Sequence, residues 1–101
     1  MDRIRSDQGS TRIRARLIIS GRVQGVAYRA SACNVAQAQR LSGWVRNRYD
    51  GDVETVVEGG EDAVHRFIAW CHAGPPGARV AAVQVTIEPY TGEFRGFRIV
   101  G

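Results

Sequence analysis

A glycine-containing stretch near the start of the chain has the residues to bind a phosphate group. It reads Gly21-Arg22-Val23-Gln24-Gly25-Val26-Ala27-Tyr28-Arg29. The glycines let the backbone curl, so that unpaired N–H groups of a loop and of a first helical turn can point toward an anion. The guanidinium of Arg29 adds a planar pair of donors for two phosphate oxygens. From residue types alone, an ordinary strand-to-helix connection with a surface arginine is the more common outcome, because short glycine-containing loops are frequent.

The stretch differs from three other phosphate-binding or nucleotide-binding loops. A Walker loop would end in Gly-Lys followed by Ser or Thr, and a dinucleotide fingerprint would begin with Gly-x-Gly. A cysteine phosphatase would place its nucleophilic cysteine before the arginine, whereas Cys33 follows Arg29. These three classes are therefore excluded for this stretch.

The cysteines and histidines do not predict a metal site. Cys33 and Cys71 are too few and too far apart for a disulfide framework, and neither has metal-ligand spacing. His65 and His72 would lie about 10 Å apart along one helix, which is long for a shared metal. We expect free thiols with Cys71 packed as a small hydrophobe, exposed histidines, and neither a metal nor another cofactor.

The apolar pattern predicts the elements that would position this loop. Asp50-Gly51 indicates a hairpin turn between two alternating runs, and Gly74-Pro75-Pro76-Gly77 ends a helix. The predicted helices are 28–41 and 61–73, and the predicted strands are 13–20, 44–49, 52–58, 80–88 and 97–100.

This order predicts a ferredoxin-like α+β fold, a split β-α-β sandwich (βαββαβ). The expected arrangement is one antiparallel sheet with two helices on one face. We expect residues 1–12 to form a flexible Arg-rich N-terminal tail and residues 13–101 to form the domain.

Two blocks of the sequence resemble the acylphosphatase family. The first is the stretch from Gly21 to Arg29, and the second is Gly43-Trp44-Val45-Arg46-Asn47 followed by Asp50-Gly51-x-Val53-Glu54. The similarity extends from about residue 13 to residue 101. The chain departs from the family pattern at Tyr28, where Phe is frequent, and at Gln39-Arg40-Leu41, where Leu-Gly-Leu is frequent.

The resemblance implies an acylphosphatase, which hydrolyses an acyl phosphate to a carboxylate and inorganic phosphate. It implies that Arg29 binds the phosphoryl group and that Asn47 positions the attacking water. It implies no metal and no covalent intermediate, and we expect phosphate or sulfate to occupy the loop as well. The residues implied to bind phosphate through their amides are Val23, Gln24, Gly25, Val26, Ala27 and Tyr28.

The charge distribution argues against a nucleic-acid partner. The net charge is +4, but residues 1–16 hold five Arg against two Asp and so contribute +3. The rest of the chain has a net charge of only +1. A nucleic-acid-binding module on the same fold stays open as an alternative that rests on the Arg-rich start. A second alternative is a regulatory domain that binds phosphate without turnover.

Length and hydropathy indicate one small domain without a membrane partner. The chain has 101 residues, of which 44% are hydrophobic and 24% charged. No apolar run approaches the roughly 18 residues of a membrane span. The arginines among the first sixteen residues do not fit a signal-peptide core. We expect a cytoplasmic monomer.

Overall fold

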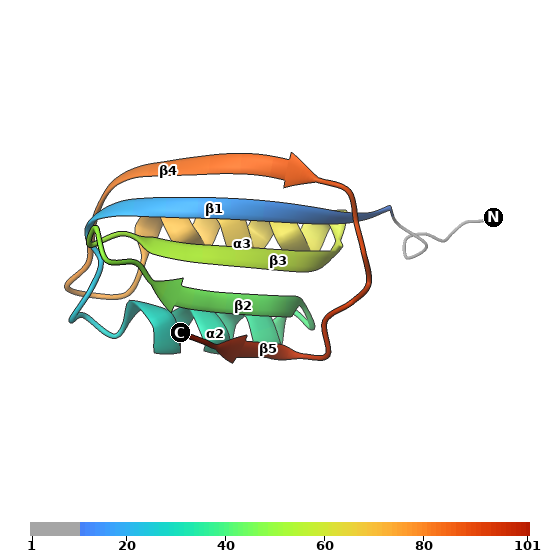
Figure 1. Cartoon of the computed structure of the whole chain (residues 1–101), viewed down its shortest axis with the longest axis horizontal. Coiled ribbons are helices and arrows are strands. Elements are labelled where there is room, and N and C mark those ends of the chain that lie inside the picture. The colour runs from blue at the N-terminus through green and yellow to red at the C-terminus, as the bar shows by residue number, and fades with distance from the viewer. Residues whose placement is uncertain (1–10) are drawn as a thin grey trace.

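The computed structural model describes residues 11–101. Figure 1 shows the strands of one sheet lying over two helices. In chain order the elements are β1 (Arg12–Arg22), α2 (Tyr28–Ala38), β2 (Ser42–Asn47), β3 (Val53–Gly60), α3 (Glu61–Ala73), β4 (Arg79–Glu88) and β5 (Phe97–Ile99). The ferredoxin-like α+β class is confirmed.

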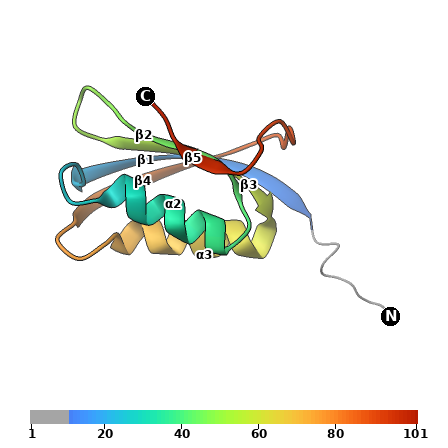
Figure 2. The same ribbon diagram turned by 90° about the horizontal axis from the view of Figure 1, so that it is seen from below.

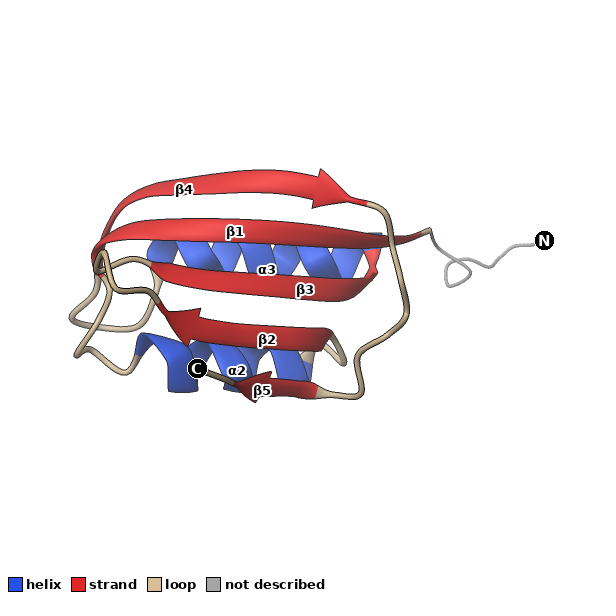
Figure 3. Ribbon diagram, in the orientation of Figure 1, coloured by secondary structure: helices blue, strands red, loops and turns tan. Residues whose placement is uncertain are grey.

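The sheet is mixed, with the strand order β4-β1-β3-β2-β5. Neighbouring strands pair antiparallel as predicted, with one exception. The prediction of a fully antiparallel sheet was wrong for β5, which runs parallel to β2. The connection after β4 descends along one end of the sheet and enters the opposite edge in the direction of β2 (Figure 1). Both helices cover the same face (Figures 2 and 3), so the other face of the sheet is open.

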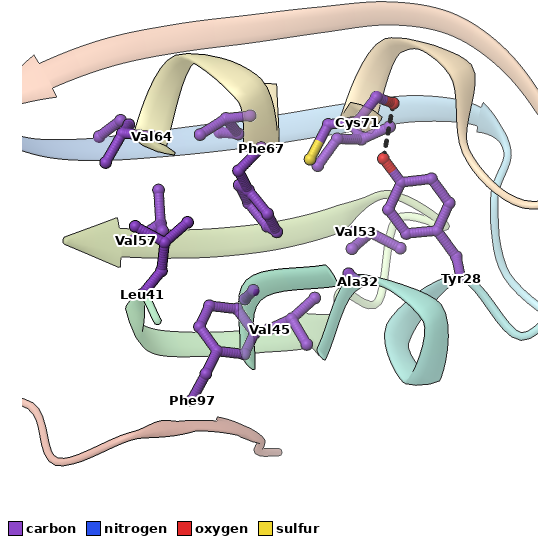
Figure 4. Close-up of a cluster of buried hydrophobic side chains, with 14 of the residues drawn as sticks. Tyr28, Ala32, Leu41, Val45, Val53, Val57, Val64, Phe67, Cys71 and Phe97 are labelled. Carbon is purple, nitrogen blue, oxygen red and sulfur yellow. Dashed lines mark hydrogen bonds between the residues drawn. The ribbon is translucent and has the colours of Figure 1, made fainter. Parts of the chain in front are cut away.

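The core lies between the sheet and the helices. On β1 the buried residues Ala15, Leu17 and Ile19 alternate with more exposed ones, as a strand with one covered face requires. On α3 the spacing of Val64, Phe67 and Cys71 places all three in the core, and the burial of Cys71 confirms its prediction as a small hydrophobe. The buried residues of helix α2 are Tyr28, Ala32 and Ala36, and Figure 4 shows Tyr28 and Ala32 among the core side chains.

Helix α2 ends earlier than predicted, at Ala38 and not at Leu41. Arg40 adopts a left-handed conformation with φ 59°. The N–H of Leu41 donates to the carbonyl of Ala36 at 2.9 Å, and the N–H of Arg40 donates to that of Gln37 at 3.0 Å. These two bonds form a Schellman motif, in which glycine is the usual left-handed residue. The turn therefore forms here although an arginine occupies the glycine position.

The folded chain begins before the predicted boundary at residue 13. Arg12 is the first residue of β1, and the carbonyl of Thr11 accepts a hydrogen bond from the N–H of Glu61 at 2.9 Å. The rest of the predicted tail, residues 1–10, lies outside the described residues.

Arginines near the start of the chain form ion pairs on the open face of the sheet. Arg16 contacts Glu54 at 2.6 Å and Glu88 at 2.9 Å, and Arg14 contacts Glu88 at 2.9 Å and buried Glu58 at 3.4 Å. The positive charge of residues 1–16 is thus partly neutralised within the fold. This pairing weakens the nucleic-acid alternative, which needs free cations for phosphates.

Candidate active site

The predicted phosphate loop connects β1 to α2 and has a backbone suited to an anion. Gly25 has φ 78° and Ala27 has φ 62°, whereas Val26 between them does not have a positive φ. A tight turn of this kind can direct successive N–H groups toward one point, which forms an anion-binding concavity. The strain at Ala27, a residue with a Cβ in the left-handed region, is typical of functional loops.

The amides of this loop and of the first turn of α2 are unpaired in the described structure. Helix α2 starts after Ala27 without a side-chain cap and without an acidic residue in its first turn. The first helical bond runs from the N–H of Ser31 to the carbonyl of Ala27 at 3.1 Å. No N–H from residues 23–30 donates to another group within residues 11–101. The positive end of the helix dipole adds to these free donors, so an anion is favoured here.

A pocket of about 280 Å³ opens at this loop and contains both predicted catalytic residues. Arg29 comes from the first turn of α2 and Asn47 from the end of β2. The residues that line this pocket are Val23, Gln24, Gly25, Ala27, Tyr28, Arg29, Ala30, Asn47 and Ile99. Among the predicted loop residues, Val26 does not line the pocket and packs against the core.

Asn47 presents an unpaired acceptor. It is the last residue of β2 and pairs with Val53 at the start of β3. Its amide oxygen Oδ1 is buried and has no hydrogen-bond partner within residues 11–101. A buried acceptor without a partner costs about 1–3 kcal/mol, so such atoms are uncommon in stable folds. Because Asn47 also lines the loop pocket, this unpaired oxygen belongs to a residue of the candidate site.

Gln24 joins the phosphate loop to the hairpin that carries Asn47. Its Nε2 donates to the carbonyl of Arg48 and to the carbonyl of Asp52, each at 2.9 Å. Both carbonyls belong to the connection between β2 and β3, which contains the hairpin turn predicted at Asp50-Gly51. The side-chain amide therefore links the loop to the turn that follows Asn47, a contact that its position in the sequence does not reveal.

Tyr28 anchors the start of α2 to α3. Its hydroxyl donates to the carbonyl of Cys71 at 2.7 Å (Figure 4), and its ring centroid lies 5.3 Å from that of Trp70. Burial raises the pKa of the hydroxyl, which therefore stays protonated as the donor. This contact holds the helical turn that carries Arg29 against the core.

Two residues of the pocket, Ala30 and Ile99, are not identified from the sequence. Ala30 follows Arg29 on α2, so its place could have been found from the predicted start of the helix. Ile99 lies on β5, which enters the site from the far end of the chain. No local pattern signals such a contact.

A second pocket, of about 490 Å³, is lined by Arg46 through Asp50 and by Gly101. It shares only Asn47 with the loop pocket. Its two guanidinium groups are engaged, because Arg46 pairs with Glu54 at 2.6 Å and Arg48 with Asp50 at 3.0 Å. The loop pocket, with its free amides, is therefore the stronger candidate for a phosphate.

The thiols and imidazoles lie away from the candidate site. Cys71 is buried, Cys33 is partly exposed, and both are free. His65 and His72 are exposed on α3. Within residues 11–101 no three His, Cys, Asp or Glu side chains gather where they could hold a metal ion. Neither helix in this part of the chain has the length and apolar character to span a membrane.

The comparison with protein families agrees with this geometry. The family model described as acylphosphatase matches residues 15–99, which include the loop, Arg29 and Asn47. The chain belongs to the acylphosphatase family. The matched range also includes β5 and therefore the whole pocket.

Acylphosphatases of known sequence and structure resemble this chain over most of its length. The acylphosphatase of Aeropyrum pernix is 58% identical over 86% of this chain and 87% of its own. That of a Roseiflexus species is 56% identical over 86% of this chain and 94% of its own. The crystal structure of the Bacillus subtilis acylphosphatase has a TM-score of 0.85 at 37% identity, over 88% of this chain and 99% of that one. Family and relatives together support a hydrolase that acts on acyl phosphates.

Proposed function

We propose that the protein hydrolyses acyl phosphates in the loop pocket by direct attack of a water molecule on phosphorus. The observation that carries this proposal is the composition of the pocket. The pocket combines loop residues with unpaired amides, the guanidinium of Arg29, and Asn47 with its unpaired Oδ1. The amides and the guanidinium fit a phosphoryl group, and Oδ1 fits a neutral hydrogen-bond donor such as water.

In the proposed binding step, the phosphoryl oxygens accept hydrogen bonds from the amides of residues 23–29. The guanidinium of Arg29 donates to two oxygens at once, which fixes the orientation of the phosphorus. Both groups lie at the positive end of α2, so they also stabilise the charge that gathers on these oxygens during reaction.

In the proposed chemical step, Asn47 orients the water but does not deprotonate it. A carboxamide has no basic site at neutral pH, so Oδ1 can only accept a hydrogen bond from the water. The water oxygen forms a bond to phosphorus, the bond from phosphorus to the acyl oxygen breaks, and the carboxylate leaves with that electron pair. The water proton passes to a phosphoryl oxygen, so an acyl phosphate and water become a carboxylate and dihydrogen phosphate.

Positioning and charge stabilisation account for most of the expected acceleration. A carboxylate is a good leaving group, so the reaction needs little help from a general acid. Holding the water and the phosphorus in reactive geometry removes much of the entropic barrier. The preformed amides and Arg29 supply the electrostatic part, because they need no reorganisation when the charge develops.

The proposal is tested by the hydrolysis of benzoyl phosphate in the presence of EDTA. We expect turnover by the wild type, and a fall in kcat of about 100-fold or more for Asn47→Ala with little change in inhibition by phosphate. Arg29→Gln should lose both turnover and phosphate binding. Arg66→Gln, an exposed variant on α3, serves as the matched arginine control.

Two results would contradict the proposal. A folded wild type that binds phosphate without turnover would support the regulatory alternative. An Asn47→Ala variant that keeps its kcat but loses phosphate binding would assign Asn47 to the ground-state complex and not to the water.

We further propose that the enzyme works without a metal, as a monomer, in the cytoplasm. The chemistry supports the first point, since Arg29 and the amides already supply the positive charge that a metal would bring. The two free thiols suit a reducing compartment. Activity that persists in EDTA would support the metal-free reaction. A gel-filtration elution volume that corresponds to a single chain would support the monomer.

A further inference from the structure

The mouth of the loop pocket is formed by its exposed lining residues. Val23 and Tyr28 form a buried floor, while Gln24, Arg29 and Asn47 are half-buried. The exposed lining residues are Gly25, Ala27, Ala30 and Ile99. Ile99 is the one large side chain among these four, and 45% of it is exposed.

The position of Ile99 follows from the register of the last strand. Ile99 pairs with Val45 on β2, and Phe97 on the same face of β5 is buried against the helices. Ile99 therefore also faces the helix side of the sheet. At this point the neighbouring groups are Ala30 and Asn47 of the pocket, and not a closed core. The isoleucine thus has exposed apolar surface at the pocket, which a ligand bound there would cover.

The proposed reaction places the acyl group at this mouth. The phosphoryl oxygens are held by the loop amides and Arg29, so the rest of the substrate extends toward solvent. We propose that Ile99 contacts the acyl group and determines a preference for apolar, bulky acyl phosphates over acetyl phosphate. This inference rests on the proposed function and adds a specificity-determining residue to it.

The size of the effect follows from the apolar area that contact would remove from water. An aryl group over Ile99 and Ala30 would cover a few tens of Å² that a methyl group leaves largely exposed. At about 25 cal/mol per Å², this contact corresponds to a threefold to tenfold preference. The contact lies away from the phosphorus, so it should appear in KM more than in kcat.

The test compares kcat/KM for benzoyl phosphate and acetyl phosphate. In Ile99→Asn, which replaces the apolar side chain by a polar one with the same number of heavy atoms, we expect the ratio of the two values to fall threefold to tenfold through a higher KM for benzoyl phosphate. Hydrolysis of acetyl phosphate and inhibition by inorganic phosphate should change less than hydrolysis of benzoyl phosphate, because neither ligand carries a bulky apolar group. Ile99→Leu should keep the ratio of the wild type, because it preserves the apolar contact.

Ile87→Asn is the matched control for this experiment. Ile87 lies on the edge strand β4, is 57% exposed, and is not part of the pocket. An unchanged ratio in Ile99→Asn, or an equal fall in Ile87→Asn, would overturn the role of Ile99 while leaving the proposed function standing. A folded wild type that hydrolyses neither substrate would overturn the proposed function and this inference together.

Discussion

The hydroxyl of Tyr28 compensates for a donor that the end of α3 lacks. In a continuing helix, the carbonyl of Cys71 would accept from the N–H four residues later, but that residue is Pro75, which has none. The Tyr28 hydroxyl takes this place at 2.7 Å. The phenylalanine frequent in the family could not make this bond. A single oxygen therefore connects the start of one helix to the end of the other.

At the residue scale, Tyr28→Phe should destabilise the fold. The change leaves the buried carbonyl of Cys71 without a partner, so the free energy of unfolding should fall by about 1–3 kcal/mol. Urea denaturation at neutral pH measures this difference. Tyr90→Phe, at a 44% exposed tyrosine, should change stability little. Equal stability of Tyr28→Phe and the wild type would show that the carbonyl finds another donor.

Between elements, Gln24 connects the phosphate loop to the β2–β3 hairpin. Both N–H groups of its amide are used, one on the carbonyl of Arg48 and one on that of Asp52. The site is divided between these two elements, since Arg29 follows the loop and Asn47 precedes the turn. We therefore expect the relative position of the two proposed catalytic side chains to depend on Gln24.

At the element scale, Gln24→Glu should lower activity strongly. A carboxylate cannot donate to either carbonyl and repels both, so the hairpin should shift relative to the loop. A misplacement of about 1 Å can cost on the order of 100-fold in rate, and we expect kcat/KM to fall about 10-fold to 100-fold. Steady-state kinetics measures the fall, and circular dichroism checks the fold. Gln84→Glu, on exposed β4, is the matched control, and activity unchanged by Gln24→Glu would refute the positioning role.

In the whole molecule, Glu58 binds the connection between β4 and β5, residues 89–96, which joins the two edges of the sheet. Its carboxylate is fully buried and accepts hydrogen bonds from the N–H of Thr91 at 2.8 Å and from that of Gly92 at 3.0 Å. Burial alone would raise the pKa of this carboxyl, but these bonds and Arg14 outweigh it and keep the pKa below the ordinary value of 4.5. The connection then leads to β5 and to Ile99 at the pocket.

At the scale of the molecule, this carboxyl should make stability sensitive to acid. Because its pKa is lowered in the folded state, its contribution is present above the ordinary value of 4.5 and is lost as pH falls through the folded value. Glu54 and Glu88 on the same face also have lowered pKa values and add to the loss. In Glu58→Gln, the free energy of unfolding at pH 7 should be lower by about 2 kcal/mol.

The difference between Glu58→Gln and the wild type should shrink as pH falls below 4.5, because the wild-type carboxyl also becomes neutral. Urea denaturation across this range measures it. Glu61→Gln, at an exposed residue of α3, is the control. A difference that does not depend on pH would mean that the charge of Glu58 does not stabilise the connection.

Local sequence patterns were sufficient for features whose causes lie within a few residues. The bounds of α3 agree with the prediction, because the apolar spacing from Val64 to Cys71 and the following Gly-Pro-Pro-Gly act locally. The hairpin at Asp50-Gly51 was found for the same reason. The end of α2 was predicted too late, because Arg40 occupies a left-handed position that glycine usually marks. Asn47 was identified through the family resemblance and not through its own pattern.

The sequence alone was enough for the element order and the fold class, because both follow from local periodicity and turn residues. The phosphate-binding role of the loop and the catalytic roles of Arg29 and Asn47 stay predictions, which rest on the family resemblance. Only the tertiary structure decided the direction of β5, the burial of Glu58 and the place of Ile99 at the pocket. Each of these depends on residues far apart in the chain, brought together by the crossing between the two edges of the sheet. A periodic pattern reports which face of an element is covered, but not which distant group covers it.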